Sequence, residues 1–170
     1  MINWSEQDMR VSRTELKKAH ERLQDLSVPL SELSKKQMKK LPVSEYFLAE
    51  LTALADITSA IAKKRQIKRV GKLISEENRH ELVNALFKTR FSPEQVAKIE
   101  AWTSRLNIND EGTMKQFCKQ YKMAERNSIY QLLLWIEYAK HMNDDELLEE
   151  SEQDLISYIK EVAMLKLINE

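Results

Sequence analysis

Basic side chains are concentrated in one ten-residue segment, KKRQIKRVGK (63–72), which contains six Lys and Arg and no Asp or Glu. If this basic segment is helical, most of its charges fall on one face. Such a face can neutralise several phosphates of a nucleic acid and release their counterions. Further basic residues lie upstream, among them Lys17, Lys18, Arg22, Lys35, Lys36, Lys39 and Lys40. The alternative interpretation is a solvated helix face that binds nothing.

Gly71 interrupts the basic segment with a residue that costs about 1 kcal/mol relative to Ala in a helix. It would admit a nucleic-acid backbone or, alternatively, a neighbouring helix at close range. Gly71 and Lys72 do not form a nucleotide-binding loop, because the glycines that precede the Gly-Lys pair of such loops are missing. Trp102 offers another possible contact with nucleic acid, since an exposed indole can stack on a base.

Other residue types that carry chemistry are too few or wrongly spaced for a catalytic or metal site. Glu77 and His80 have the spacing of helical di-iron sites, but those sites need a second such pair and two more carboxylates. Cys118 is the single cysteine, which excludes a disulfide framework, and no histidine marks it as a nucleophile. We therefore expect a binding protein without catalytic activity, metal or cofactor.

The composition favours an all-α fold. The 170 residues include only 2 Gly and 3 Pro, fewer than the turns of a sheet protein or a phosphate loop would require. No apolar run approaches the roughly 20 residues needed to span a bilayer, and the first ten residues lack the apolar core of a signal peptide. We expect a cytoplasmic protein.

Apolar periodicity and capping signals predict the helices. Ser12 and Glu15 form a capping box before the first helix, which Pro29 is expected to close. Further helices are expected over 31–40, 44–75, 77–89, 93–106, 113–122, 125–142 and 151–167. The acidic stretch 144–154 is expected to form a loop and the start of the last helix.

The expected long helix over 44–75 changes its apolar face halfway. Phe47, Leu51, Leu54, Ile57 and Ile61 share one arc, which beyond Ala62 is occupied by basic residues. If the helix is continuous, its first half packs one bundle and its second half packs another, whereas a break near Lys63 would alter this geometry. This predicts two tandem helical bundles of about three helices each, linked through that helix, with a tail over 1–10, a bundle over 11–75 and a bundle over 76–170.

The two halves of the chain carry opposite charge. Residues 1–90 contain 18 basic and 12 acidic side chains, and residues 91–170 contain 9 and 15. This split of +6 and −6 suggests that an anionic partner contacts the first half only. A different class of function is also open, in which the chain is a protein–protein adaptor that bridges two partners through its basic and acidic halves.

Two motifs resemble the bacterial DarP (YjgA) family of dual-action ribosomal maturation proteins. VSRTELKK (11–18) is similar to the V-S-K-S-E-L-K-R motif of that family, and KKRQIKRVGKLI (63–74) is similar to its R-R-R-Q-x-x-x-I-G-K-L motif. Between them, LSELSKKQMKKLPVSE fits the family's L-x-x-L-x-x-x-x-x-x-x-L-P pattern. The resemblance is clearest over residues 10–90.

The resemblance implies a non-enzymatic factor of ribosome biogenesis with two helical bundles. It implies binding to rRNA of late large-subunit (50S) precursors near the peptidyl transferase centre, whose maturation the factor promotes beside other assembly factors. Basic ribosomal proteins are possible further partners, and we expect a monomer. The predicted rRNA-binding residues are Lys63, Lys64, Arg65, Gln66, Lys68, Arg69 and Lys72, with Arg13, Lys17, Lys18, Lys36, Lys39 and Lys40 added from the upstream helices.

Overall fold

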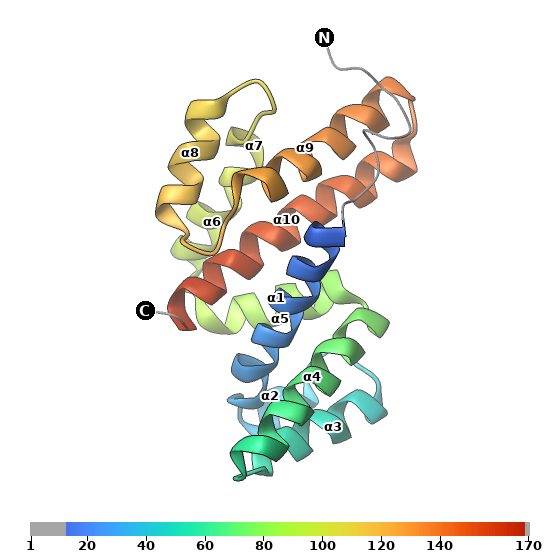
Figure 1. The fold of residues 1–170 in the computed structure, drawn as a ribbon, viewed down its shortest axis with the longest axis vertical. Helices are drawn as coiled ribbons and strands as arrows, with labels where there is room; N and C mark the ends of the chain where they lie inside the picture. Colours follow the sequence, from blue (N-terminus) through green and yellow to red (C-terminus); the bar gives the residue numbers. More distant parts are fainter. Residues whose placement is uncertain (1–12, 169–170) are drawn as a thin grey trace. The chain divides into compact units, whose positions relative to one another are not determined.

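The computed structural model describes residues 13–168, and every regular element among them is an α-helix (Figure 1). The all-α prediction is therefore confirmed. The chain divides into two compact units, and the described residues of each can be treated separately. The N-terminal unit spans residues 17–92, and the C-terminal unit comprises residues 13–16 and 93–168. The division falls after residue 92, whereas we expected a boundary near residue 75.

The N-terminal unit is built from five helices around one apolar core. They are α1 (Arg13–Ser31), of which all but the first turn belongs to this unit, α2 (Lys35–Lys39), α3 (Glu45–Asp56), α4 (Ala60–Glu76) and α5 (Arg79–Arg90). Each helix contributes to the core, whose largest buried side chains are Leu26, Leu30, Phe47, Leu51, Leu54, Ile74, Leu82, Leu86 and Phe87.

Side-chain caps define where these helices begin. Ser34 accepts a hydrogen bond from the Gln37 amide, and the Gln37 side chain accepts one from the Ser34 amide, which is a complete capping box. Ser44 caps α3 through the Phe47 amide at 3.2 Å, and Asn78 caps α5 through the Glu81 amide at 3.2 Å. Each cap satisfies a backbone N–H that has no partner within its helix.

The expected continuous helix over 44–75 is wrong, because the chain breaks at residues 57–59. Ile57 is extended, and Ser59 caps a new helix through the Ala62 amide at 3.5 Å. Thr58 and Ser59 are residues whose side chains compete for backbone hydrogen bonds and therefore favour caps over helix interiors. The result is a hairpin in which α3 and α4 pack side by side (Figure 1). The change of apolar face thus reflects two helices in one unit, not one helix shared by two bundles.

Several helix ends also differ from the prediction. Pro29 lies inside α1, which continues to Ser31. Pro removes one backbone hydrogen bond, but burial of its neighbour Leu30 holds the last turn in place. The helix expected over 31–40 is shortened to α2, since α1 occupies its first residue. Ser12 of the expected capping box lies outside the described residues, as does the expected tail.

The C-terminal unit is dominated by two long helices that pack against each other. They follow three shorter ones, and the five helices are α6 (Pro93–Glu100), α7 (Trp102–Arg105), α8 (Glu111–Gln120), α9 (Arg126–His141) and α10 (Asp145–Ile168). The helix expected over 93–106 is interrupted at Ala101. The acidic stretch forms the first turns of α10 rather than a loop, where carboxylates interact favourably with the helix dipole.

An aromatic cluster stabilises the short helices of this unit. Phe117 packs edge-on against Trp102, with ring centroids 5.2 Å apart. The ring of Tyr121 is tilted relative to that of Phe117, with centroids 4.9 Å apart. Trp102 is buried and is therefore not available to stack on a base. The suggestion that its indole contacts nucleic acid is wrong. None of the helices described is long and apolar enough to cross a membrane.

Candidate nucleic-acid interface

The α3–α4 hairpin positions the basic segment, which forms most of α4. The two helices run antiparallel, because Tyr46 contacts Arg69 while Glu50 contacts both Arg69 and Gln66. The open end of the hairpin is closed by Glu77, whose carboxylate accepts hydrogen bonds from the Ser44 amide and hydroxyl. These contacts fix α4 against α3, so the basic segment belongs to a packed hairpin rather than to an isolated helix.

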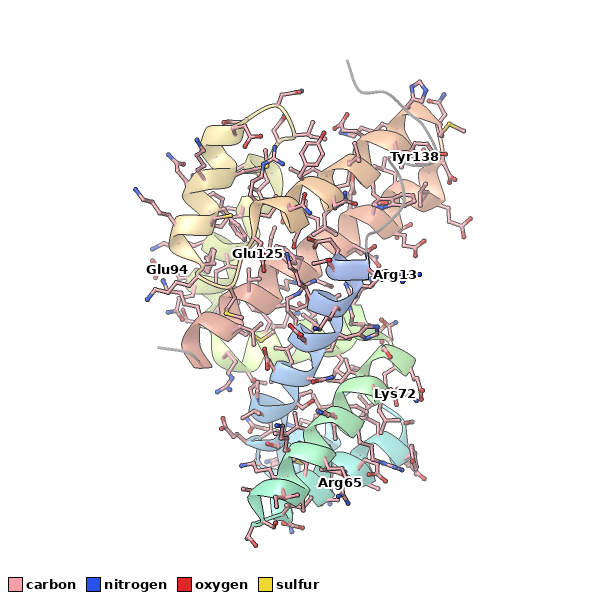
Figure 2. The ribbon with its side chains drawn as sticks, viewed as in Figure 1. Arg13, Arg65, Lys72, Glu94, Glu125 and Tyr138 are labelled. Atoms are coloured by element: carbon pink, nitrogen blue, oxygen red, sulfur yellow. The ribbon has the colours of Figure 1, made fainter. Side chains whose placement is uncertain are left out.

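One face of α4 is basic and exposed. At about 100° per residue, Arg65, Lys68 and Lys72 fall within an arc of roughly 60°, and all three side chains are exposed. Figure 2 labels Arg65 and Lys72 on α4. Val70 and Ile74 lie well away from this arc and are buried. No hydrogen bond or ion pair engages these three cations within the part of the chain that the structure describes. We call Arg65, Lys68 and Lys72 the basic stripe.

Arg69 and Gln66 belong to the same motif but serve the hairpin. The Gln66 amide donates to the Glu50 carboxylate at 2.8 Å and to the Glu50 carbonyl at 2.9 Å. Arg69 Nε donates to the same carboxylate at 3.0 Å. The hydrogen bond from Gln66 is the largest influence that lowers the pKa of Glu50, and Arg69 adds to it. Both residues were predicted to bind rRNA, and in this structure their polar groups are occupied by α3.

The remaining predicted contacts are spread over three helices. Lys63 and Lys64 are exposed in the first turn of α4, and Lys36, Lys39 and Lys40 are exposed on or directly after α2. On α1, Lys17 is exposed and Lys18 is half-buried, while Arg13 is exposed in the turn that belongs to the C-terminal unit. Of the residues predicted to bind rRNA, those of the basic stripe lie together on one face of a single helix.

Gly71 allows α1 and α4 to approach each other, which decides between the two roles that the sequence left open. A Cβ atom at Gly71 would lie 2.6 Å from Gln24 Cγ and 2.8 Å from Gln24 Cα. Gly71 is itself buried. Next to it, the Ser27 hydroxyl donates to the Ile67 carbonyl at 3.4 Å. A neighbouring helix, not a nucleic-acid backbone, occupies the space above this glycine.

Two exposed residues of the hairpin were missed by the sequence reasoning. Ile61 was assigned to the core arc, but it is 77% exposed and lies on the same side of α4 as the basic stripe. Tyr46 is 55% exposed at the start of α3, and its hydroxyl accepts a hydrogen bond from Arg69. The signal was available for Tyr46, since it falls outside the apolar arc of Phe47, Leu51 and Leu54.

The other candidate chemistry finds no support in the described residues. They contain no group of three or more His, Cys, Asp or Glu that could hold a metal ion. Burial, followed by the charge of Glu125, raises the pKa of the Cys118 thiol, which makes it a poor nucleophile at neutral pH.

A groove lies on the surface of the C-terminal unit. It has a volume of about 470 Å³ and is lined by apolar side chains of α9 and α10, including Leu133, Ile136 and Leu155. Three carboxylates border it: Glu137 is paired with Lys140 at 3.5 Å, Glu100 is paired with Lys160 at 3.3 Å, and Glu152 has no ion-pair partner among the described residues.

Comparison with known proteins places these features in a family. The sequence profile described as dual-action ribosomal maturation protein DarP matches residues 9–160. The chain belongs to the DarP family. The matched range includes the α3–α4 hairpin with its basic stripe and most of the C-terminal unit.

Curated DarP proteins resemble the chain over most of its length. The protein of Proteus mirabilis is 29% identical over 157 residues, which cover 90% of this chain and 82% of that protein. The protein of Haemophilus ducreyi is 25% identical over 166 residues, covering 94% and 92%. Both carry the name dual-action ribosomal maturation protein DarP. No solved structure matches the fold significantly.

Proposed function

We propose that this DarP-family chain is a non-enzymatic factor of ribosome biogenesis that binds rRNA of large-subunit precursors through the basic stripe. The observation that carries the proposal is the set of three exposed cations on one face of α4, each without an internal partner in the described structure. The name of the family supports a role in ribosome maturation. In this proposal the protein acts in the cytoplasm, where it binds near the peptidyl transferase centre and promotes its maturation.

The charge of each unit supports an RNA contact by the N-terminal unit. Residues 17–92 contain 16 Lys and Arg and 9 Asp and Glu, a net charge of +7, and the rest of the chain carries −7. An RNA would therefore be attracted to the N-terminal unit and repelled by the other. Lys36 and Lys39 on α2, Lys40 directly after it, and Lys17 on α1 are secondary contacts in this proposal.

The test is a charge reversal that spares the hairpin. The variant Arg65→Glu, Lys68→Glu, Lys72→Glu changes the basic stripe but keeps Arg69, because loss of its bonds to Glu50 would disturb α3. The matched control is Lys115→Glu, Lys119→Glu, Lys122→Glu, which makes the same change of charge at exposed positions in and directly after α8. Circular dichroism checks that both variants remain folded.

Sucrose-gradient sedimentation in cell lysate at about 50 and 200 mM salt is the functional measurement. With roughly five phosphate contacts, affinity should fall on the order of 10²–10³-fold between these salt concentrations. The wild type and the α8 control should travel with large-subunit precursors at low salt, and the stripe variant should stay at the top. If the stripe variant still travels with the precursors, the proposed RNA contact is wrong.

A second candidate function, a protein–protein adaptor, is favoured by the groove of the C-terminal unit. Its unpaired Glu152 and the net charge of −7 suit a basic ribosomal protein as partner. The variant Glu149→Lys, Glu152→Lys reverses two carboxylates of α10 and separates the two functions. Loss of particle association in this variant, with retention in the stripe variant, would support the adaptor and count against rRNA binding.

A further inference from the structure

Tyr46 differs from every other aromatic side chain in the described residues, because it alone is exposed. The others are buried or half-buried, as expected for rings that fill a core. An aromatic ring on a water-exposed helix face contributes little to folding, since most of its apolar surface remains in water. The exposed ring face is therefore available to a ligand.

The ring of Tyr46 is held in place by a chain of polar contacts. Its hydroxyl accepts a hydrogen bond from Arg69, and Arg69 is bound to Glu50. Glu50 is fixed in turn by two hydrogen bonds from the Gln66 side chain. A ligand that packs on the ring would consequently lose little affinity to the ordering of this side chain.

The ring is also close to the basic stripe. Arg69, which contacts Tyr46, lies four residues after Arg65 and three residues before Lys72. Residues at these spacings are neighbours on a helix surface. Phosphates bound by the stripe would thus bring their bases within reach of the ring. A cationic track beside an aromatic platform is the combination by which proteins bind unpaired nucleotides.

We propose that Tyr46 stacks on an unpaired base of the RNA that the basic stripe binds. The inference rests on the proposed function and adds the class of RNA: a segment with at least one unstacked nucleotide. The interior of a duplex cannot use the ring, because its bases remain stacked within the helix and only backbone and groove edges are exposed there.

Fluorescence anisotropy with two defined probes tests this inference. The probes are a labelled twelve-nucleotide oligouridine and a labelled twelve-base-pair blunt RNA duplex, each titrated with the full chain at about 50 mM salt. The duplex has the higher charge density, so the absolute affinities are not compared. The informative quantity is the loss of affinity on each probe when the ring is replaced.

Three variants separate stacking from charge and from structure. Tyr46→Leu keeps apolar bulk without the aromatic face, and we expect it to weaken oligouridine binding about fivefold or more while changing duplex binding less than twofold. Tyr46→Phe keeps the ring and should retain most of the affinity for oligouridine. The stripe variant Arg65→Glu, Lys68→Glu, Lys72→Glu should weaken both probes. Thermal melting checks that each variant folds as the wild type does.

The outcomes distinguish this inference from the function on which it rests. If Tyr46→Leu binds oligouridine as well as the wild type, or loses the same affinity for both probes, the stacking role is wrong although the stripe still binds RNA. If Tyr46→Phe loses as much as Tyr46→Leu, the hydroxyl and not the ring face matters, and the inference fails. If the wild type binds neither probe, the proposed function itself is wrong.

Discussion

Replacing each of the two glycines by alanine should change stability in opposite directions. Both lie inside helices, where Ala is favoured over Gly by up to about 1 kcal/mol. A Cβ at Gly112 meets only the Asp110 carboxylate oxygen at 3.4 Å, which is an ordinary contact. Gly112→Ala should therefore stabilise the chain by a few tenths of a kcal/mol to about 1 kcal/mol, with the lower values expected because Gly112 lies in the first turn of α8.

Gly71→Ala should destabilise the chain despite the same gain in helix propensity. Its Cβ would lie 2.8 Å from Gln24 Cα and 3.1 Å from the Gln24 amide nitrogen. These are backbone atoms, so no side-chain rotation relieves the contact and α1 must move away from α4. Overpacking typically costs about 1–3 kcal/mol and sometimes more. Since propensity returns about 1 kcal/mol, a net loss of roughly 0–2 kcal/mol remains, and its upper part is expected because the close contacts are with backbone atoms.

Thermal and urea unfolding of the full chain measure both substitutions. A double variant, Gly71→Ala with Gln24→Ala, removes the contact with Gln24 Cγ at 2.6 Å but keeps the backbone contacts, so it should recover only part of the loss. Equal or greater stability of Gly71→Ala would refute the reasoning, because it would mean that the approach of α1 and α4 does not require a glycine. Full recovery in the double variant would show that the side chain, not the backbone, sets the limit.

Three further predictions follow from single contacts. The lowered pKa of Glu50 means that its carboxylate contributes stability above its usual pKa of 4.5, and that this stability is lost as pH falls below that value; Glu50→Gln should flatten this part of the stability–pH curve. Glu15 is buried and accepts hydrogen bonds from Asn127 at 3.1 Å and Ser128 at 2.6 Å, so Glu15→Ala should cost about 1–3 kcal/mol in urea unfolding by leaving the buried Ser128 hydroxyl unpaired. Cys118 should react with a thiol reagent at pH 7.5 more slowly than free cysteine, and urea should abolish the difference, because burial raises its pKa.

Local sequence signals predicted the helices better than the way the helices are connected. The helices expected over 77–89, 113–122 and 125–142 correspond to α5, α8 and α9, and each predicted bound lies within two residues of the observed one. The prediction of one helix over 44–75 was wrong, because the change of apolar face was interpreted as packing against a second bundle. The same pattern arises when two helices fold back on each other, and the N-cap residue Ser59 marks the start of the second helix.

The candidate site was predictable as a charged segment but not as a surface. Charge and motif identified Arg65, Lys68 and Lys72, and the structure shows them on one exposed face. The different role of Arg69 depends on Glu50, which lies 19 residues away in sequence and meets it only in the hairpin. Because the break at residues 57–59 was not predicted, the contact between Glu50 and Arg69 could not be predicted from the sequence either.

The basic motif therefore combines two kinds of residue, and this affects how its charge should be interpreted. Gln66, Arg69 and Gly71 attach α4 to α3 and α1. A variant that reverses all six charges of the motif would disturb both the hairpin and the proposed RNA contact, so a loss of binding could not be assigned to either. Because the basic stripe has no internal partner in the described residues, reversing it alone separates the two roles, and the family's motif can then be read as a scaffold that carries a binding face.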